Sequence, residues 1–166
     1  MDDLEDVFLL LLADKNQVKN HWQHSWHNGY PLSHMIIADE NADIGKIILQ
    51  AGSRIIAVAH GYACNVFAHW LYSAGMDEQR NICAAILASP DINSWSEDES
   101  AAENRARVNF PAAVVSVQNS PVCDKTEKIA RKLGAKHIIC PKIQTLDAPL
   151  RGWQWGMNLM QDMLLR

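Results

Sequence analysis

The segment RIIAVAHGYACNVFAHW, residues 54–70, decides how the rest of this chain is organised. It begins with an apolar, mostly β-branched run at residues 55–58, which is too short for a helix and suits a strand buried in a parallel sheet. A turn through small residues around Gly61 follows. Apolar residues then recur at helical spacing, at Val66, Phe67, Trp70 and Leu71. The segment therefore predicts a strand, a one-residue corner and a helix.

Gly61 stands at the predicted corner. A strand, a sharp corner and a helix form the frame of a nucleophile elbow, in which the corner residue is strained and carries a reactive side chain. Glycine reaches a positive φ without a Cβ penalty, so it forms such a turn easily. It has no side chain that can attack a substrate. The sequence thus predicts the shape of an elbow without its reactive atom.

Length and composition indicate one domain over residues 1–166. The chain has 166 residues, 48% of them apolar, and a net charge of -4, which gives no reason to expect nucleic acid as a partner. No apolar run approaches the roughly 20 residues that span a bilayer, so no membrane partner is expected. Acidic residues precede the first apolar run, unlike the basic start of a secretory signal. Four cysteines without zinc-type spacing indicate reduced thiols. We therefore expect a cytoplasmic protein with no metal and no cofactor.

Apolar segments alternate with helical patterns along the whole chain. This alternation predicts an α/β fold in three layers, with a mostly parallel sheet of about six strands and helices on both faces. The strands are expected at residues 7–12, 34–38, 55–58, 81–89, 112–117 and 137–140. The helices are expected at residues 17–26, from a cap at Asp39 or Asn41 to Gly52, after Gly61, at 123–133 and at 153–165, with a solvent-facing helix or loop at 93–109. Binding sites in such sheets lie beyond the carboxyl ends of the strands.

Four motifs together carry a resemblance to a known family. They are HWQ with Trp26 (residues 21–26), VAHGYAC with AHW (residues 58–70), ASPD (residues 88–91) and Trp153 with Gly156. In this order they resemble the small α/β-hydrolases grouped with retinoblastoma-binding protein 9 and the YdeN-like serine hydrolases. The resemblance spans nearly the whole chain and implies an α/β-hydrolase fold.

The catalytic residues that the resemblance implies are all replaced. The family's nucleophilic serine falls on Gly61, its aspartate on Ser120, and its histidine near Ile143. Triad chemistry needs an activated hydroxyl, a base and an orienting carboxylate within hydrogen-bond reach. The loop that helps to form the family's oxyanion hole holds Ala13 and Asp14 here, and a carboxylate opposes an oxyanion. Three losses indicate a degenerate member, a pseudohydrolase without catalytic residues.

We therefore expect a small ligand or a protein partner to bind at or near the vestigial cleft. The missing nucleophile should leave room above Gly61. The N–H of Tyr62 begins a helix, where oxygen-bearing groups such as carboxylate, phosphate or carbonyl are favoured. Trp153 and Trp155 suit a pocket wall, but they suit a filled core equally well. The predicted binding residues are His60, Gly61, Tyr62, Ala13, Asp14, Trp153 and Trp155.

Alternative functions remain open on the sequence. One is a hydrolase that uses Cys123, Cys140 or a bound water, and another is a structural or homo-oligomer-forming relative. The histidines at residues 21, 24 and 27 suit a metal site poorly, because the third is turned away from the others on a helix. His60 is expected to support the elbow rather than act as a base. The acidic segment 97–103 suits either a solvated face or a docking surface for a basic partner.

Overall fold

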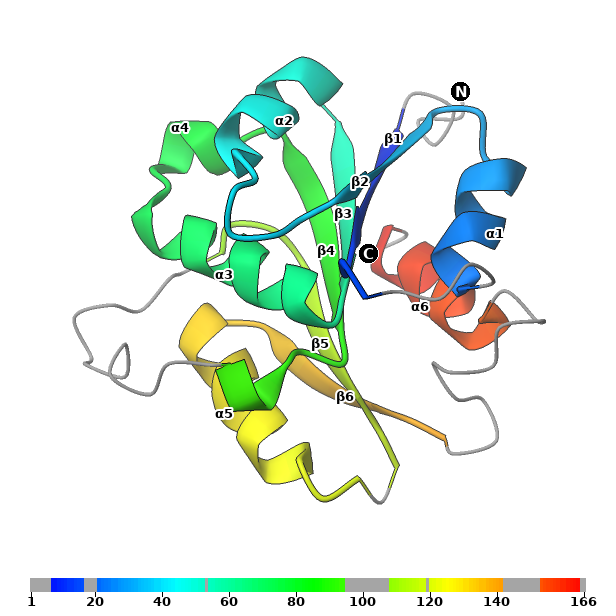
Figure 1. Ribbon diagram of the computed structural model, residues 1–166, viewed down its shortest axis with the longest axis vertical. Helices are drawn as coiled ribbons and strands as arrows, with labels where there is room; N and C mark the ends of the chain where they lie inside the picture. Colours follow the sequence, from blue (N-terminus) through cyan, green and yellow to red (C-terminus); the bar gives the residue numbers. More distant parts are fainter. Residues whose placement is uncertain are drawn as a thin grey trace.

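A computed structural model of the chain describes residues 7–16, 21–52, 54–94, 108–118, 120–141 and 153–164 (Figure 1). Its elements alternate between strand and helix over most of their order, as the apolar pattern predicts. They are β1 (Phe8–Ala13), α1 (Trp22–Gly29), β2 (Ser33–Ile37), α2 (Ile44–Ala51), β3 (Ile55–His60), α3 (Tyr62–Ser73), α4 (Met76–Gln79), β4 (Ile82–Ala88), the 3-10 turn η2 (Ile92–Ser94), β5 (Ala112–Val117), α5 (Cys123–Leu133), β6 (Lys136–Cys140) and α6 (Gln154–Leu164).

The strands form one six-stranded sheet in the order β2-β1-β3-β4-β5-β6, and each described pair is parallel. The central strands read as unbroken apolar runs because helices cover both of their faces. In β3, for example, the first five residues are all buried. The predicted parallel sheet of about six strands with helices on both faces is confirmed.

Two apolar cores lie on the two faces of the sheet, beneath the helices that cover each face. Alternate residues of β1 feed them: Leu10 and Leu12 pack with residues of α2, α3 and α5, whereas Leu9 and Leu11 pack with residues of α1 and α6. This alternation follows from the two-residue repeat of a strand. Helices α1 and α6 therefore share one face, and α2, α3 and α5 share the other.

The strand order reverses at β1, which has β2 on one side and β3 on the other. Such a topological switch point, here between β1 and β3, opens a crevice at the carboxyl ends of these two strands. The residues that follow these ends are Asp14 after β1 and Gly61 after β3. The topology thus brings the predicted corner against the loop that follows the first strand.

Several predicted boundaries are wrong, and local hydrogen bonds explain why. The cap of α2 is Asp43, whose carboxylate accepts from the N–H of Lys46 at 3.1 Å, rather than Asp39 or Asn41. Asp39 instead accepts from the N–H of Asn41 at 2.9 Å and forms a turn. His21 caps α1, so this helix begins at Trp22. The short helix α4 was not predicted from the sequence. The predicted Ile143 position and the acidic segment 97–103 lie outside the described residues.

Candidate functional site

The corner after β3 has the backbone of an elbow. Gly61 has φ 63° and ψ -132°, a conformation that favours glycine. Its N–H donates to the carbonyl of Ala88 at 3.1 Å, and its own carbonyl accepts from the N–H of Cys64 at 3.1 Å. The corner is thereby fixed between the end of β4 and the first turn of α3. The strand-corner-helix unit predicted from residues 54–70 is present.

Asp14 occupies the space above this corner. Its Oδ2 accepts a hydrogen bond from the N–H of Tyr62 at 3.0 Å, and its Oδ1 accepts from the N–H of Asn16 at 3.0 Å. A Cβ placed on Gly61 would overlap Asp14 Oδ2 and stand 3.0 Å from Asp14 Cγ. The prediction of open space above Gly61 is therefore wrong, because the carboxylate of Asp14, in the loop after β1, fills that space. Ala13, the residue before Asp14, is buried at the end of β1.

Two histidines pack together behind Asp14. The rings of His21 and His60 lie 4.2 Å apart between centroids, and His21 Nδ1 accepts from the N–H of Gln23 at 3.2 Å. Burial lowers the pKa of His21 to about 3, helped by His60 and His24, while Asp14 acts in the opposite direction. An imidazole with so low a pKa is a poor general base near neutral pH. These histidines support the corner by packing.

Gln23 joins the two strands whose ends form the crevice. It is fully buried, and its Nε2 donates to the carbonyl of Leu12 at 3.2 Å and to that of Val58 at 3.0 Å. The HWQ motif thus has a structural meaning: His21 caps α1, Trp22 enters the core and Gln23 clamps β1 to β3. Sequence reasoning noticed this motif as a family likeness but missed what each residue contacts.

Trp153 and Trp155 lie on the other side of the sheet from α3. Trp153 is 2% exposed, and its ring lies 4.6 Å from that of Trp22 and 6.0 Å from that of Trp26, between centroids. Trp155 packs beside it at 5.8 Å. Position 156 requires glycine, because any side chain there would overlap the Trp153 ring. In the described structure this aromatic group fills the core between α1 and α6, which is the second of the two interpretations that the sequence allowed.

Ser120, the position of the expected aspartate, lies after β5 and supports its own turn. Its N–H donates to the carbonyl of Val117 at 3.0 Å, and its Oγ accepts from the N–H of Val122 at 3.4 Å. Strand β5 is separated from β3 by β4. The carboxylate that does lie at the corner is that of Asp14, which follows β1.

Three of the four thiols, those of Cys64, Cys123 and Cys140, donate hydrogen bonds to backbone carbonyls. Burial raises the pKa of Cys140, and burial together with Asp14 raises the pKa of Cys64 well above its ordinary value. Cys123 donates to the carbonyl of Val117 at 3.4 Å and lies 3.4 Å from Ser116 Oγ, which lies 2.7 Å from His137 Nε2. Nucleophilic chemistry requires a thiolate, so the two buried thiols are poorly suited to it.

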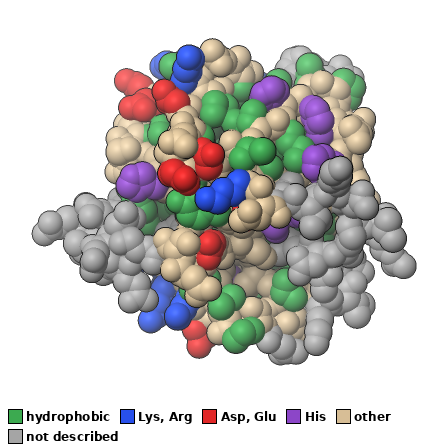
Figure 2. Space-filling view, viewed as in Figure 1, with side chains coloured by type: hydrophobic (Ala, Val, Ile, Leu, Met, Phe, Trp, Pro, Cys, Tyr) green, Lys and Arg blue, Asp and Glu red, His purple; other side chains and the backbone are tan. Residues whose placement is uncertain are grey.

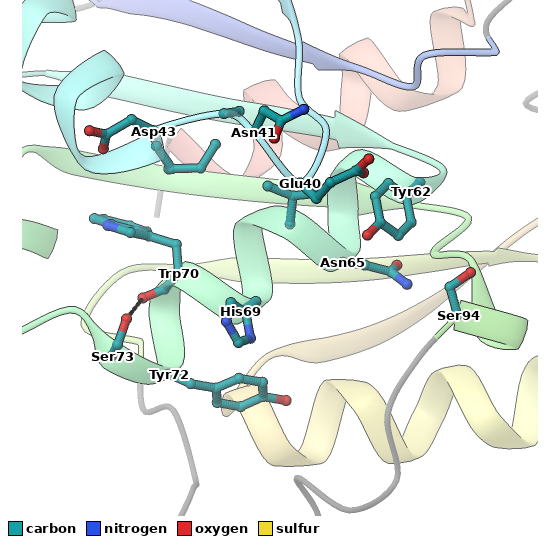
Figure 3. A pocket seen from close by; sticks show the side chains of 13 residues that line it. Glu40, Asn41, Asp43, Tyr62, Asn65, His69, Trp70, Tyr72, Ser73 and Ser94 are labelled. Atoms are coloured by element: carbon teal, nitrogen blue, oxygen red, sulfur yellow. Dashed lines mark hydrogen bonds between the residues drawn. The ribbon is translucent and has the colours of Figure 1, made fainter.

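A groove of about 630 Å³ runs along the outer side of α3 (Figure 3). Two acidic residues, Glu40 and Asp43, lie along it together with the aromatic rings of Tyr62, Trp70 and Tyr72. Glu40 stands beside Tyr62 at one end, and Asp43 stands near Trp70 at the other (Figure 3). None of the described residues that line the groove is a lysine or arginine. The predicted binding residue Tyr62 belongs to it, whereas Trp153 and Trp155 do not.

Lys15 contacts two residues at one end of this groove. Its Nζ lies 3.8 Å from Glu40 Oε2 and 5.5 Å from the centre of the Tyr62 ring. Both charged side chains are about half exposed, at 48% for Lys15 and 59% for Glu40. Figure 2 shows acidic side chains gathered around a basic one near the middle of the face that is in view.

Sequence reasoning missed the groove, although a signal for it was present. The polar and aromatic residues of α3 recur every three or four positions, at Tyr62, Asn65, His69 and Tyr72. This pattern marks a second face of the helix, opposite the buried Ala63, Phe67 and Leu71. Glu40 lies in the turn formed by Asp39, and Asp43 is the cap of α2; the sequence assigned neither role correctly.

Comparisons with known proteins agree with the fold. A family model described as serine hydrolase matches residues 9–161. No curated protein sequence matches the chain. Among solved structures, a YdeN-like hydrolase from Pectobacterium atrosepticum has a TM-score of 0.73 at 14% identity, covering 98% of this chain and 92% of that one. An esterase from Pyrococcus furiosus has a TM-score of 0.53 at 9% identity, covering 97% and 82%. At these identities the two structures establish the fold alone.

Two further features bear on the site. In the part of the chain that the structure describes, no group of three or more His, Cys, Asp or Glu side chains is placed to hold a metal ion. Within the same residues, the helices are all too short or too polar to cross a bilayer.

Proposed function

We propose, for a chain that belongs to the serine hydrolase family, that it is a non-catalytic member: a pseudohydrolase that binds a small ligand beside its vestigial active site. The observation that carries the proposal is the Asp14 carboxylate, which accepts from the N–H of Tyr62 at 3.0 Å and fills the volume above Gly61. In an active elbow that volume belongs to the nucleophile and to the substrate.

The electrostatics at the corner oppose acyl-transfer chemistry. An oxyanion hole works by aiming N–H donors at the place where negative charge develops. Here the N–H of Tyr62 already donates to a fixed carboxylate, which would repel a developing oxyanion. The histidine beside it, His21, has a pKa near 3 and is buried, so it is unsuited to activate a hydroxyl or a water.

The groove along α3 is the place that we propose for the ligand. It shares Tyr62 with the corner, and its volume is within the range of small-molecule sites. Of the binding residues expected from the sequence, the proposal keeps Tyr62 as a contact. His60, Gly61, Ala13 and Asp14 shape the corner beside it. A cytoplasmic location belongs to the same proposal and is supported by the four free cysteines.

Ester hydrolysis tests this proposal. Wild-type protein and the Asp14→Ala variant are incubated with p-nitrophenyl acetate and butyrate, with Asp124→Ala on α5 as a matched exposed control. We expect no saturable turnover above background from any of the three. Saturable turnover by the wild type that Asp14→Ala abolishes would contradict the proposal and favour a water-based hydrolase in which Asp14 is the base.

A further inference from the structure

We propose that the groove along α3 binds a small organic primary amine, whose ammonium group takes the place that Lys15 Nζ now occupies between Glu40 and Tyr62. The inference rests on the proposed function, in which this groove is the ligand site, and it names the chemical class of the ligand. It replaces the oxygen-bearing ligand expected from the sequence, because Asp14 has taken the N–H that such a ligand would use.

Charge along the groove favours a cation. Glu40 and Asp43 both line it, and the described lining residues include no lysine or arginine; Lys15, beside the groove, lies 3.8 Å from Glu40. A third carboxylate, that of Asp91, is held at the same end of the sheet: it accepts from Ser94 Oγ at 2.9 Å, and its backbone is tied to the side chain of Asn65. An anionic ligand would lie close to Glu40 and Asp43, and the nearby Lys15 ammonium group is already paired with Glu40.

Aromatic rings provide the second element of an amine site. Tyr62, Trp70 and Tyr72 line the groove together with Val66. The face of an aromatic ring attracts a cation, and the strength of this attraction rises when the cation is partly desolvated. Trp70 is itself held in place by Phe67, whose ring lies 5.9 Å away between centroids. A volume of about 630 Å³ accommodates an apolar body attached to the ammonium group.

Lys15 demonstrates that the end of the groove accepts an ammonium group. Its Nζ lies 5.5 Å from the centre of the Tyr62 ring and 3.8 Å from Glu40 Oε2, so one carboxylate and one ring face already share a primary ammonium. Exposed ion pairs of this kind contribute little to stability. With side chains about half exposed, the lysine can leave and a ligand ammonium can enter without disturbing the core.

The test uses amines that copy the lysine side chain. Binding of n-butylammonium and of 2-phenylethylammonium to the full chain is measured by NMR titration and calorimetry, with 1-butanol and butyrate as the neutral and anionic analogues. We expect both amines to bind and to shift the amide signals of α3 near Tyr62, with the phenyl compound tighter. We expect 1-butanol and butyrate to leave those signals unchanged.

Charge variants sharpen the result. Lys15→Met removes the internal competitor and should strengthen amine binding roughly two- to five-fold, whereas Glu40→Gln should weaken it by a similar factor. Both residues are exposed, so both variants should fold. The matched controls are Lys125→Met and Glu127→Gln on α5; the latter opens a second exposed ion pair, with Arg131 at 2.8 Å. These controls should bind amines as the wild type does.

Two results would overturn the inference: equal binding of 1-butanol or butyrate at the same signals, or amine affinities that Lys15→Met and Glu40→Gln leave unchanged. Either result leaves the proposed function standing when ester turnover is also absent. Saturable ester turnover by the wild type, in contrast, would refute the proposed function whatever the amines do.

Discussion

Tyr62 takes part in two neighbouring regions that differ in how they are filled. Its backbone N–H faces the corner, where Asp14 accepts its proton at 3.0 Å. Its ring faces the groove, where Lys15 Nζ lies 5.5 Å from the ring centre. The same short loop after β1 therefore contacts both regions, with a carboxylate in one and an ammonium group in the next.

The two contacts differ in length and in exposure to solvent. The Asp14 contact is a charge-assisted hydrogen bond at a helix N-terminus, in a space with no room for another group. The Lys15 contact is long and exposed, beside a groove of about 630 Å³. In the proposed function, the filled corner carries no chemistry and the groove binds the ligand.

The largest expected effect comes from Gly61→Ser, which tests the closed corner. A side chain at φ 63° and ψ -132° is strained, and its Cβ would overlap the Asp14 carboxylate. Together these should lower the free energy of unfolding by about 2–4 kcal/mol. Urea denaturation measures the loss, and no esterase activity should appear.

A double-mutant cycle separates strain from overlap in that variant. In the Asp14→Ala background, Gly61→Ser should cost clearly less, since only the backbone strain remains. Equal costs in both backgrounds would mean that Asp14 does not occupy the space above Gly61, and the account of the corner would be wrong.

The pH dependence of stability tests the packing behind the corner. The pKa of His21 is lowered to about 3 in the folded protein from the ordinary 6.5, so the unfolded chain binds more protons between these values. Stability from this group is complete above pH 6.5 and declines as the pH falls toward 3. Between pH 7 and pH 5 the decline should be about 1–2 kcal/mol.

His21→Asn provides the control for that measurement. Asparagine is a good helix N-cap, so the variant should retain the cap of α1 while losing the titrating group. Its free energy of unfolding should vary less with pH than that of the wild type over the same interval. An unchanged pH profile would show that His21 is not buried as a neutral imidazole.

A smaller effect compares the two contacts of the loop after β1 directly. Asp14→Ala removes the partner of a half-buried N–H and should cost about 1 kcal/mol. Lys15→Met removes an exposed, long ion pair and should change stability by about 0.5 kcal/mol or less. Thermal or urea denaturation of both variants measures the difference, and a Lys15→Met loss as large as that of Asp14→Ala would erase the distinction between the two regions.

The sequence predicted the sheet and the corner well because both follow from local patterns. Continuous apolar runs marked β1, β3, β4 and β5, and Gly61 between a strand and a helix marked the elbow. Local patterns could not predict which side chain fills the corner, because Asp14 and Tyr62 are 48 residues apart in the sequence. The sequence identified Asp14 as unfavourable for an oxyanion, but it did not indicate that this carboxylate takes the nucleophile's place.

The groove and the tryptophans show the same limit. The helical repeat of a sequence indicates which face of a helix a side chain lies on. Whether other helices or strands cover that face depends on their packing, which the repeat does not give. Trp153 is covered by α1, whereas Trp70 borders an open groove. The loop carrying Glu40 is held by local hydrogen bonds, from Asn41 to the Asp39 side chain and from Lys46 to the Asp43 side chain, and the sequence pattern did not separate these two roles.

The most direct test of a closed, unreactive corner is labelling of the wild-type protein with a fluorophosphonate probe, read by intact mass and by peptide mapping. Such probes react with serine hydroxyls that a base activates beside an oxyanion hole. The account predicts no added mass on any serine after prolonged incubation, under conditions in which an active serine hydrolase is labelled completely. Stoichiometric labelling of one serine would contradict it, and the position of that serine would identify the active site.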